Sequence, residues 1–193
     1  MEITTEIIKE LREKTGVSVM QCKKALEEAG GDLAKAEVIL RKRSAEAAEK
    51  KESRELGAGT IGSYIHENMV GAMVLLSSET DFVAKNPEFG ELARAVAMQV
   101  AATDPKYVSA EEIPAETRQA AVEVFEKEVA DKPVDMQAKI LDGKLMNYFR
   151  DQVLLDQAFI KDETKTVRGL LNEATQKFGE RIEITRFARL SVR

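Results

Sequence analysis

The chain has 193 residues, enough for one domain of good size or for one domain with a small accessory module. It carries 29 basic and 34 acidic residues, and this net charge of −5 argues against nucleic acid as the main ligand, because phosphate binding needs a basic surface. One cysteine and one histidine exclude an intrachain disulfide and leave little room for a histidine-based metal site or catalytic triad.

The first forty residues predict three short helices. The second begins at Ser18, which with Gln21 has the spacing of a capping box, and it buries Cys22 on its apolar face. The third begins at Asp32, a residue type that caps helix N-termini. Charges interrupt the apolar residues of this region, so we expect neither a signal peptide nor a membrane span. The single cysteine fits a reducing compartment.

Residues 41–55 carry mixed charges at helical spacing, such as Glu46 with Lys50, and predict a solvated helical extension or linker. A basic nucleic-acid arm is the less favoured alternative, because glutamates interrupt the basic residues. Glycines at 57 and 59 mark a domain boundary. The predicted division is a three-helix module at 1–42, a charged helical linker at 43–57 and a core domain at 58–193.

The core domain predicts strands first and helices next. Residues 60–65 and 70–76 alternate like the strands of a hairpin, joined through His66. Later helices are expected to follow Asn86, Pro114 and Pro133, with a last short helix near 167–171. Residues 181–193 predict a final strand, in which Phe187 breaks the alternation and suggests contacts on both faces. The fold class is therefore α+β: a small antiparallel sheet packed with helices on one face.

No group of residues predicts catalysis. His66 lies between polar neighbours in a predicted turn, where a solvated role is typical, and Cys22 fits a small buried side chain better than a nucleophile. The stretch "GAGTIGSY" lacks the phosphate-binding lysine and precedes a strand instead of a helix. We therefore expect no enzyme activity, no metal site and no cofactor.

The stretch "SSETDFVAKNPEFGEL" at 77–92 places Phe82 beside Asp81 in a predicted turn. An aromatic residue in an acidic turn suggests an anchor for another molecule, because a large apolar side chain is otherwise buried at home. In the alternative, Asp81 caps a helical turn and Phe82 folds back onto Phe89 and Leu92. These residues alone favour the alternative.

Three stretches, in chain order, resemble the elongation factor Ts family. "LREKTGVSVMQCKKALEEAGGDLAKAEVIL" resembles the family's N-terminal ubiquitin-associated-like module of three helices. "SYIHENMVGAMVLLSSETDFVAKN" is similar to the hairpin and the Thr-Asp-Phe loop of its core domain, and "DQAFIKDETKTVRGLL" is similar to its closing segment. The resemblance covers nearly the whole chain, which makes the alternative for Phe82 much less favoured.

The resemblance implies a guanine-nucleotide exchange factor for elongation factor Tu, acting in cytoplasmic translation elongation without a cofactor, a membrane or direct contact with nucleic acid. It implies that an Asp-Phe tip displaces the magnesium ion of the partner GTPase and releases GDP, so that GTP can bind. The tip residues carried over are Thr80, Asp81, Phe82 and Val83. The docking residues carried over in the N-terminal module are Arg12, Met20 and Lys23.

The chain departs from the family pattern in two residues and in length. Gln21 stands where an aspartate is usual, and Ser78 stands where a cysteine often precedes the tip. Longer members carry two copies of the core subdomain and this chain carries one, so we expect a homodimer, with residues 181–192 and 136–149 as interface elements. Two alternatives stay open: a helical module that binds a different partner, and a ribosome-associated RNA-binding protein that uses residues 41–51.

Overall fold

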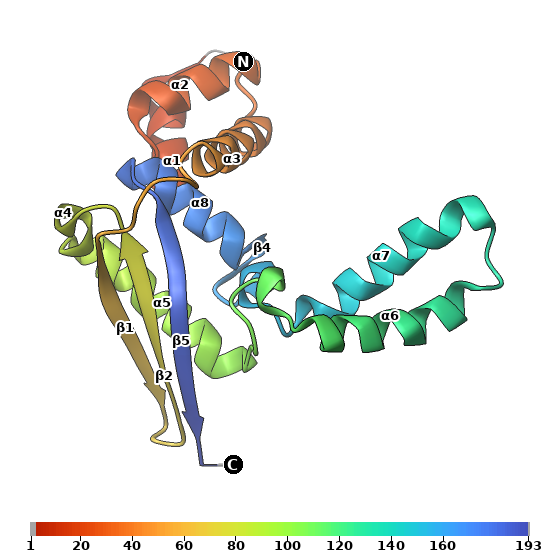
Figure 1. The fold of residues 1–193 in the computed structure, drawn as a ribbon. Coiled ribbons are helices and arrows are strands. Elements are labelled where there is room, and N and C mark those ends of the chain that lie inside the picture. The colour runs from red at the N-terminus through yellow and green to blue at the C-terminus, as the bar shows by residue number, and fades with distance from the viewer. Residues whose placement is uncertain (1–2, 193) are drawn as a thin grey trace.

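The computed structural model describes residues 3–192 and has an α+β architecture, as the sequence predicts (Figure 1). The helices are α1 (Thr5–Thr15), α2 (Val19–Glu28), α3 (Leu33–Glu49), α4 (Asp81–Ala84), α5 (Pro87–Thr103), α6 (Ala115–Val129), α7 (Val134–Arg150) and α8 (Val167–Phe178). The strands are β1 (Ala58–His66), β2 (Val70–Ser78), β3 (Ala158–Phe159), β4 (Asp162–Thr166) and β5 (Ile182–Ser191). Short 3₁₀ turns form at Ala110–Glu112 and Leu154–Asp156.

The main sheet is antiparallel, with the strand order β1-β2-β5. The predicted hairpin is confirmed, and its turn places Glu67 and Asn68 at φ 49° and 58°. Helix α5 packs across one face of the sheet, close enough that a Cβ on Gly62 would lie 2.2 Å from the carbonyl carbon of Ala93. Gly62 therefore allows the helix backbone to approach β1 directly.

Strand β5 contains a β-bulge that explains the break in alternation at Phe187. Leu76 pairs with Ile184, but Val74 pairs with Phe187, so the strand has one extra residue at Thr185. Because Leu76 and Val74 share the buried face of β2, Ile184 and Phe187 also share that face. The break in alternation thus marks a bulge that keeps Phe187 on the buried face, whereas contacts on the other face of the strand stay a prediction.

The N-terminal helices α1, α2 and α3 enclose a small apolar core of their own, which includes the fully buried Cys22. Ser18 accepts a hydrogen bond from the backbone of Gln21, as a capping residue does. Helix α3 continues to Glu49, and its buried Ser44 bonds to Gln176 of α8. The predicted helical extension is therefore packed against the core, whereas the domain limits at 42 and 57 stay predictions.

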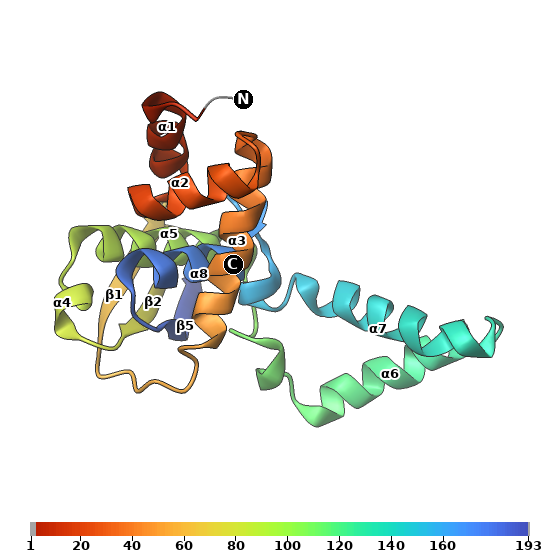
Figure 2. The ribbon, with the colours of Figure 1, turned by 90° about the horizontal axis from the view of Figure 1, so that it is seen from above.

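Helices α6 and α7 form a hairpin that projects from the core, and both ribbon views show it extending away from the sheet (Figures 1 and 2). The rings of Phe125 and Tyr148 meet edge to face at 5.6 Å between the two helices. Ile113, Phe149 and Val153 are buried at its base. Both helices follow their predicted prolines, but nothing in the sequence analysis predicted that they form a projecting arm.

Candidate functional site

The candidate tip follows the end of β2 and precedes α5. Figure 1 shows α4 at the end of the sheet nearer to α1–α3, away from the β1–β2 turn. The buried Ser78 side chain donates a hydrogen bond of 3.0 Å to the carbonyl of Thr80, which turns the chain out of the sheet. Residues 81–84 then form one turn of helix, α4.

Phe82 and Val83 lie on opposite sides of this turn. The Phe82 side chain is 82% exposed, while Val83 is 4% exposed and belongs to the main apolar core. Phe89, the proposed internal partner of Phe82, is instead fully buried, and its ring centroid lies 5.7 Å from that of Phe178. Phe82 therefore does not fold back into its own protein, and Val83 fixes the turn to the core.

Asp81 shares the exposed side of α4. Its carboxylate accepts a hydrogen bond of 2.6 Å from the ammonium group of Lys85, one helical turn later. The hydrogen bond and the charge of Lys85 hold the pKa of Asp81 below its ordinary value. Asp81 is therefore ionised at neutral pH, and its charge is balanced by a neighbour that is equally exposed.

Two glutamates hold the tip from behind, and sequence reasoning assigned neither of them. Glu180 accepts hydrogen bonds from the backbone N–H and the hydroxyl of Thr80. Glu79 accepts from the guanidinium of Arg54 and from the backbone N–H of Arg181. Burial raises the pKa of Glu79, but the Arg181 N–H and Arg54 outweigh that effect and lower the pKa below its ordinary 4.5.

The three docking residues carried over to the N-terminal module are all exposed. Arg12 lies in the last turn of α1, and Met20, 65% exposed, lies in the first turn of α2. Lys23 follows in α2 and forms a 3.9 Å ion pair with Glu27. Val19 is 55% exposed beside Met20, so the apolar surface of this module is larger than the sequence analysis proposed.

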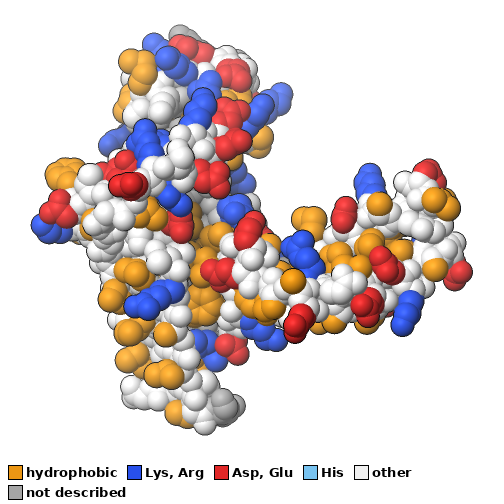
Figure 3. Space-filling view, viewed as in Figure 1, with side chains coloured by type: hydrophobic (Ala, Val, Ile, Leu, Met, Phe, Trp, Pro, Cys, Tyr) orange, Lys and Arg blue, Asp and Glu red, His pale blue; other side chains and the backbone are white. Residues whose placement is uncertain are grey.

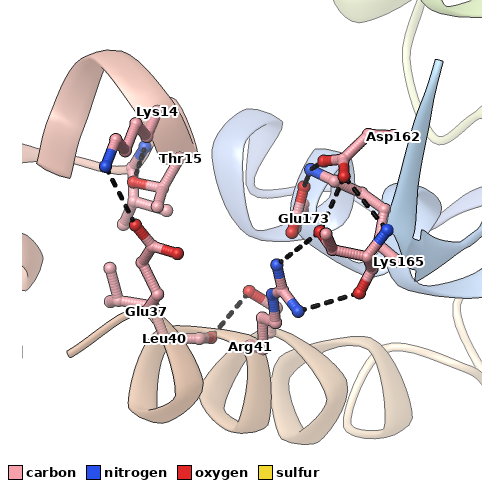
Figure 4. Close-up of a pocket in the computed structure, with 11 residues that line it drawn as sticks. Lys14, Thr15, Glu37, Leu40, Arg41, Asp162, Lys165 and Glu173 are labelled. Atoms are coloured by element: carbon pink, nitrogen blue, oxygen red, sulfur yellow. Dashed lines mark hydrogen bonds and ion pairs between the residues drawn. The ribbon is translucent and has the colours of Figure 1, made fainter. Parts of the chain in front are cut away.

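A cavity of about 240 Å³ lies where the N-terminal module meets β4 and α8 (Figure 4). Its charged groups are engaged within the protein. Arg41 donates to the carbonyl and hydroxyl of Thr164, and Lys165 pairs with Asp162 and Glu173. Lys14 pairs with Glu37 across the cavity's other wall. These contacts show that the cavity is part of the interface between the N-terminal module and the core domain.

The two residues considered for catalysis, Cys22 and His66, both make contacts within the protein. Burial raises the pKa of the Cys22 thiol, and the Nδ1 of His66 lies 3.1 Å from the hydroxyl of Tyr64. Within residues 3–192, no group of three acidic, histidine or cysteine side chains is arranged to hold a metal ion. Over the same residues, no helix is long and apolar enough to cross a membrane.

An unburied aromatic on a fixed turn, near a helical module with exposed basic and apolar side chains, indicates a protein that acts by binding another protein. Comparison with known proteins identifies the family to which the chain belongs. The family model described as "Elongation factor TS" matches residues 2–193. This chain belongs to the elongation factor Ts family, which places it in the elongation stage of protein biosynthesis.

Individual relatives match over nearly their whole length. The chain is 47% identical over 193 residues to "Elongation factor Ts" of Thermodesulfovibrio yellowstonii, covering 100% of this chain and 97% of that protein. It is 47% identical to "Elongation factor Ts" of Thermotoga petrophila and 46% identical to that of Thermotoga maritima, with the same coverage. The core and the N-terminal module are therefore both included in the resemblance.

Proposed function

We propose that this protein is a guanine-nucleotide exchange factor that binds elongation factor Tu in its GDP-bound and nucleotide-free states. The observation that carries the proposal is Phe82, which is 82% exposed on a turn held by Glu180 at Thr80 and by the burial of Val83. Burying a phenylalanine side chain supplies about 1.5–3 kcal/mol. That free energy becomes available only when a partner supplies the pocket, so it can favour a rearranged partner.

The tip acts on the partner's magnesium site indirectly. A carboxylate attracts a cation, so Asp81 by itself does not expel magnesium, and its charge is already balanced by Lys85. Insertion of Phe82 moves the segment of the GTPase that holds the metal and its water molecules. Loss of the metal then weakens binding of the diphosphate, since magnesium neutralises phosphate charge.

Exchange in this scheme needs no covalent chemistry by this chain. The factor by which the protein weakens GDP binding is also the factor by which GDP weakens binding of the protein. A ternary complex therefore forms and can release either ligand, after which GTP displaces the exchange factor. The magnesium ion and the nucleotide belong to the partner, and the reaction takes place in the cytoplasm, where elongation occurs.

The N-terminal module supplies the second contact with the partner. Its exposed side chains Arg12, Met20 and Lys23, joined by Val19, form the docking surface. Mixed apolar and basic side chains are typical of an interface anchor surrounded by polar groups. We assign docking to residues 1–42 and exchange and dimerisation to residues 58–193, with residues 43–57 between them.

The protein forms a homodimer in this proposal, through the face of the sheet that α5 does not cover. Figure 3 shows hydrophobic side chains gathered over the sheet on its visible face. The strand register places Ile61, Ile65, Met73 and Leu190 on the face opposite the buried side of β2, and they are 65%, 67%, 53% and 79% exposed. A two-fold pairing would cover the same face in both copies. Leu190 lies in the predicted interface strand, and helix 136–149 is not needed for this arrangement.

Release of labelled GDP from elongation factor Tu tests the proposed function. The intact protein should accelerate release at concentrations far below those of the GTPase, because each molecule acts repeatedly. Absence of acceleration would contradict exchange activity and favour a scaffold that binds a different partner. Binding to bare RNA that weakens steeply with salt would instead favour the RNA-binding alternative.

A further inference from the structure

Glu180 occupies a defined place behind the tip. It follows Gly179, which ends α8 in the left-handed conformation at φ 76°. One oxygen of its carboxylate accepts the backbone N–H of Thr80 at 3.0 Å, and the other accepts the Thr80 hydroxyl at 2.6 Å. Both donors of Thr80 are thus engaged by the side chain of one glutamate.

These two hydrogen bonds from Thr80 to Glu180, called the clamp below, act at the start of α4. Thr80 is the N-cap residue of that helix, but its side chain makes no capping bond to α4 itself. A helix of four residues is too short to hold its own direction, because nucleation costs more than so few bonds return. The direction of α4, and with it the exposed side of Asp81 and Phe82, is therefore set from outside the helix.

The same helix that delivers Glu180 also holds the N-terminal module. Gln176 of α8 bonds to the buried Ser44 of α3, and the Lys177 side chain lies 3.2 Å from where a Cβ on Gly16 would stand. Lys177 also pairs with Glu88 of α5 at 2.8 Å. Helix α8 thus contacts the docking module through Gln176 and Lys177, and Glu180, just after the end of the helix, contacts the tip.

We propose that Glu180 is a positioning residue for the exchange tip, an inference that rests on the proposed exchange function. It orients Asp81 and Phe82 through Thr80, and it keeps the tip in a fixed position relative to the N-terminal docking module. Loss of the clamp leaves the turn held by Val83 and Ser78 alone, so that Phe82 stays exposed but is less often in the productive direction. Docking then persists while productive insertion becomes rare.

The test compares Glu180→Ala and Glu180→Gln with Glu163→Ala, a control at an exposed glutamate of β4. GDP release is measured over a range of exchange-factor concentrations, which separates the maximal rate from the half-saturating concentration. Glu180→Ala should lower the maximal rate about tenfold and change half-saturation less than about twofold. Glu180→Gln keeps one acceptor and should recover part of the rate, while the control should match the unchanged protein.

Two further measurements make the assignment specific. Hydrogen exchange at the Thr80 amide should be faster in Glu180→Ala, since its acceptor is gone. Glu180→Ala should also cost less in a Thr80→Val background than in the unchanged protein, because both changes remove the hydroxyl contact and only Glu180→Ala removes the backbone N–H contact.

An unchanged maximal rate in Glu180→Ala would overturn the proposal, as would a rate loss that adds fully to that of Thr80→Val. A rate loss that occurs only together with unfolding of both Glu180 variants would overturn it as well. Failure of the unchanged protein to accelerate GDP release would instead contradict the exchange function itself, so the two failures are distinguishable.

Discussion

At the scale of single residues, Phe82 and Val83 show how one helical turn can both attach to the core and expose a side chain. They are neighbours in sequence, yet the first is 82% and the second 4% exposed. Consecutive residues of a helix point about 100° apart, so a single turn can bury one side chain and present the other. Val83 gives the turn its attachment to the core, and Phe82 is left for a partner.

Glu79 should contribute to stability in a pH-dependent way. Its pKa is lower in the folded protein than its ordinary 4.5, so ionised Glu79 stabilises the fold above that value. The contribution is lost as the pH falls through the lowered folded pKa. Urea unfolding should therefore show Glu79→Gln to be less stable than the unchanged protein at neutral pH, and the difference should shrink below pH 4.5. A difference that grew on acidification would contradict this assignment.

The candidate tip residues came from the family resemblance, and the residues that hold them in the structure were not predicted. Phe82 is conspicuous locally, because an aromatic beside a carboxylate in a turn conflicts with ordinary burial. Glu180 lies 100 residues away from Thr80, and no local pattern distinguishes it from other surface glutamates. Only the fold, by bringing the end of α8 to the end of β2, reveals the contact.

At the scale of elements, local signals located most boundaries and missed irregular ones. Asn86 caps α5 and Pro87 begins it as predicted, because cap and proline chemistry acts within a few residues. The bulge at Thr185 depends on pairing with β2, far away in sequence, and was not predicted. The small β3–β4 hairpin was not predicted either, although its two strands are close in sequence. The charged stretch after residue 41 was read as solvated, yet Ser44 is buried because α8 covers it.

The approach of α5 to β1 gives a prediction at this scale. Gly62→Ala should lower the free energy of unfolding by about 2–3 kcal/mol, because the new Cβ would collide with the backbone of Ala93. Gly90→Ala is the matched control, since it is also next to this contact but a Cβ there meets nothing within 4 Å. It should leave stability unchanged or raise it by about 0.5–1 kcal/mol. Equal urea midpoints for the two variants would contradict the close packing.

At the scale of the whole molecule, α8 links the parts that the proposed function needs together. It packs on α3 of the N-terminal module, lines the main core and ends at the clamp on the tip. The sequence resemblance implied a docking module and a tip, but only the fold shows how the two are placed relative to each other. A docking module and a tip held in fixed register can contact one partner simultaneously, which lowers the entropy lost on binding.

The uncovered face of the sheet gives a prediction about assembly. Leu190→Asp should convert a dimer to a monomer, because a charge buried in an apolar interface is costly. Light scattering measures the mass directly. Val134→Asp, at an 84% exposed valine that begins α7, is the matched control and should not change it. A monomeric unchanged protein, or a dimer that survives Leu190→Asp, would contradict dimerisation through this face.

The central claim is that Phe82 is kept exposed in this protein so that it can be buried in a partner. Its most direct test measures GDP release from elongation factor Tu and urea unfolding on the same Phe82→Ala protein, with Val83→Ala alongside. Phe82→Ala should slow stimulated release about 10- to 150-fold with an unchanged free energy of unfolding, whereas Val83→Ala should lower that free energy by about 2 kcal/mol. Normal stimulation by Phe82→Ala, or a loss of stability as large as that of Val83→Ala, would contradict the claim.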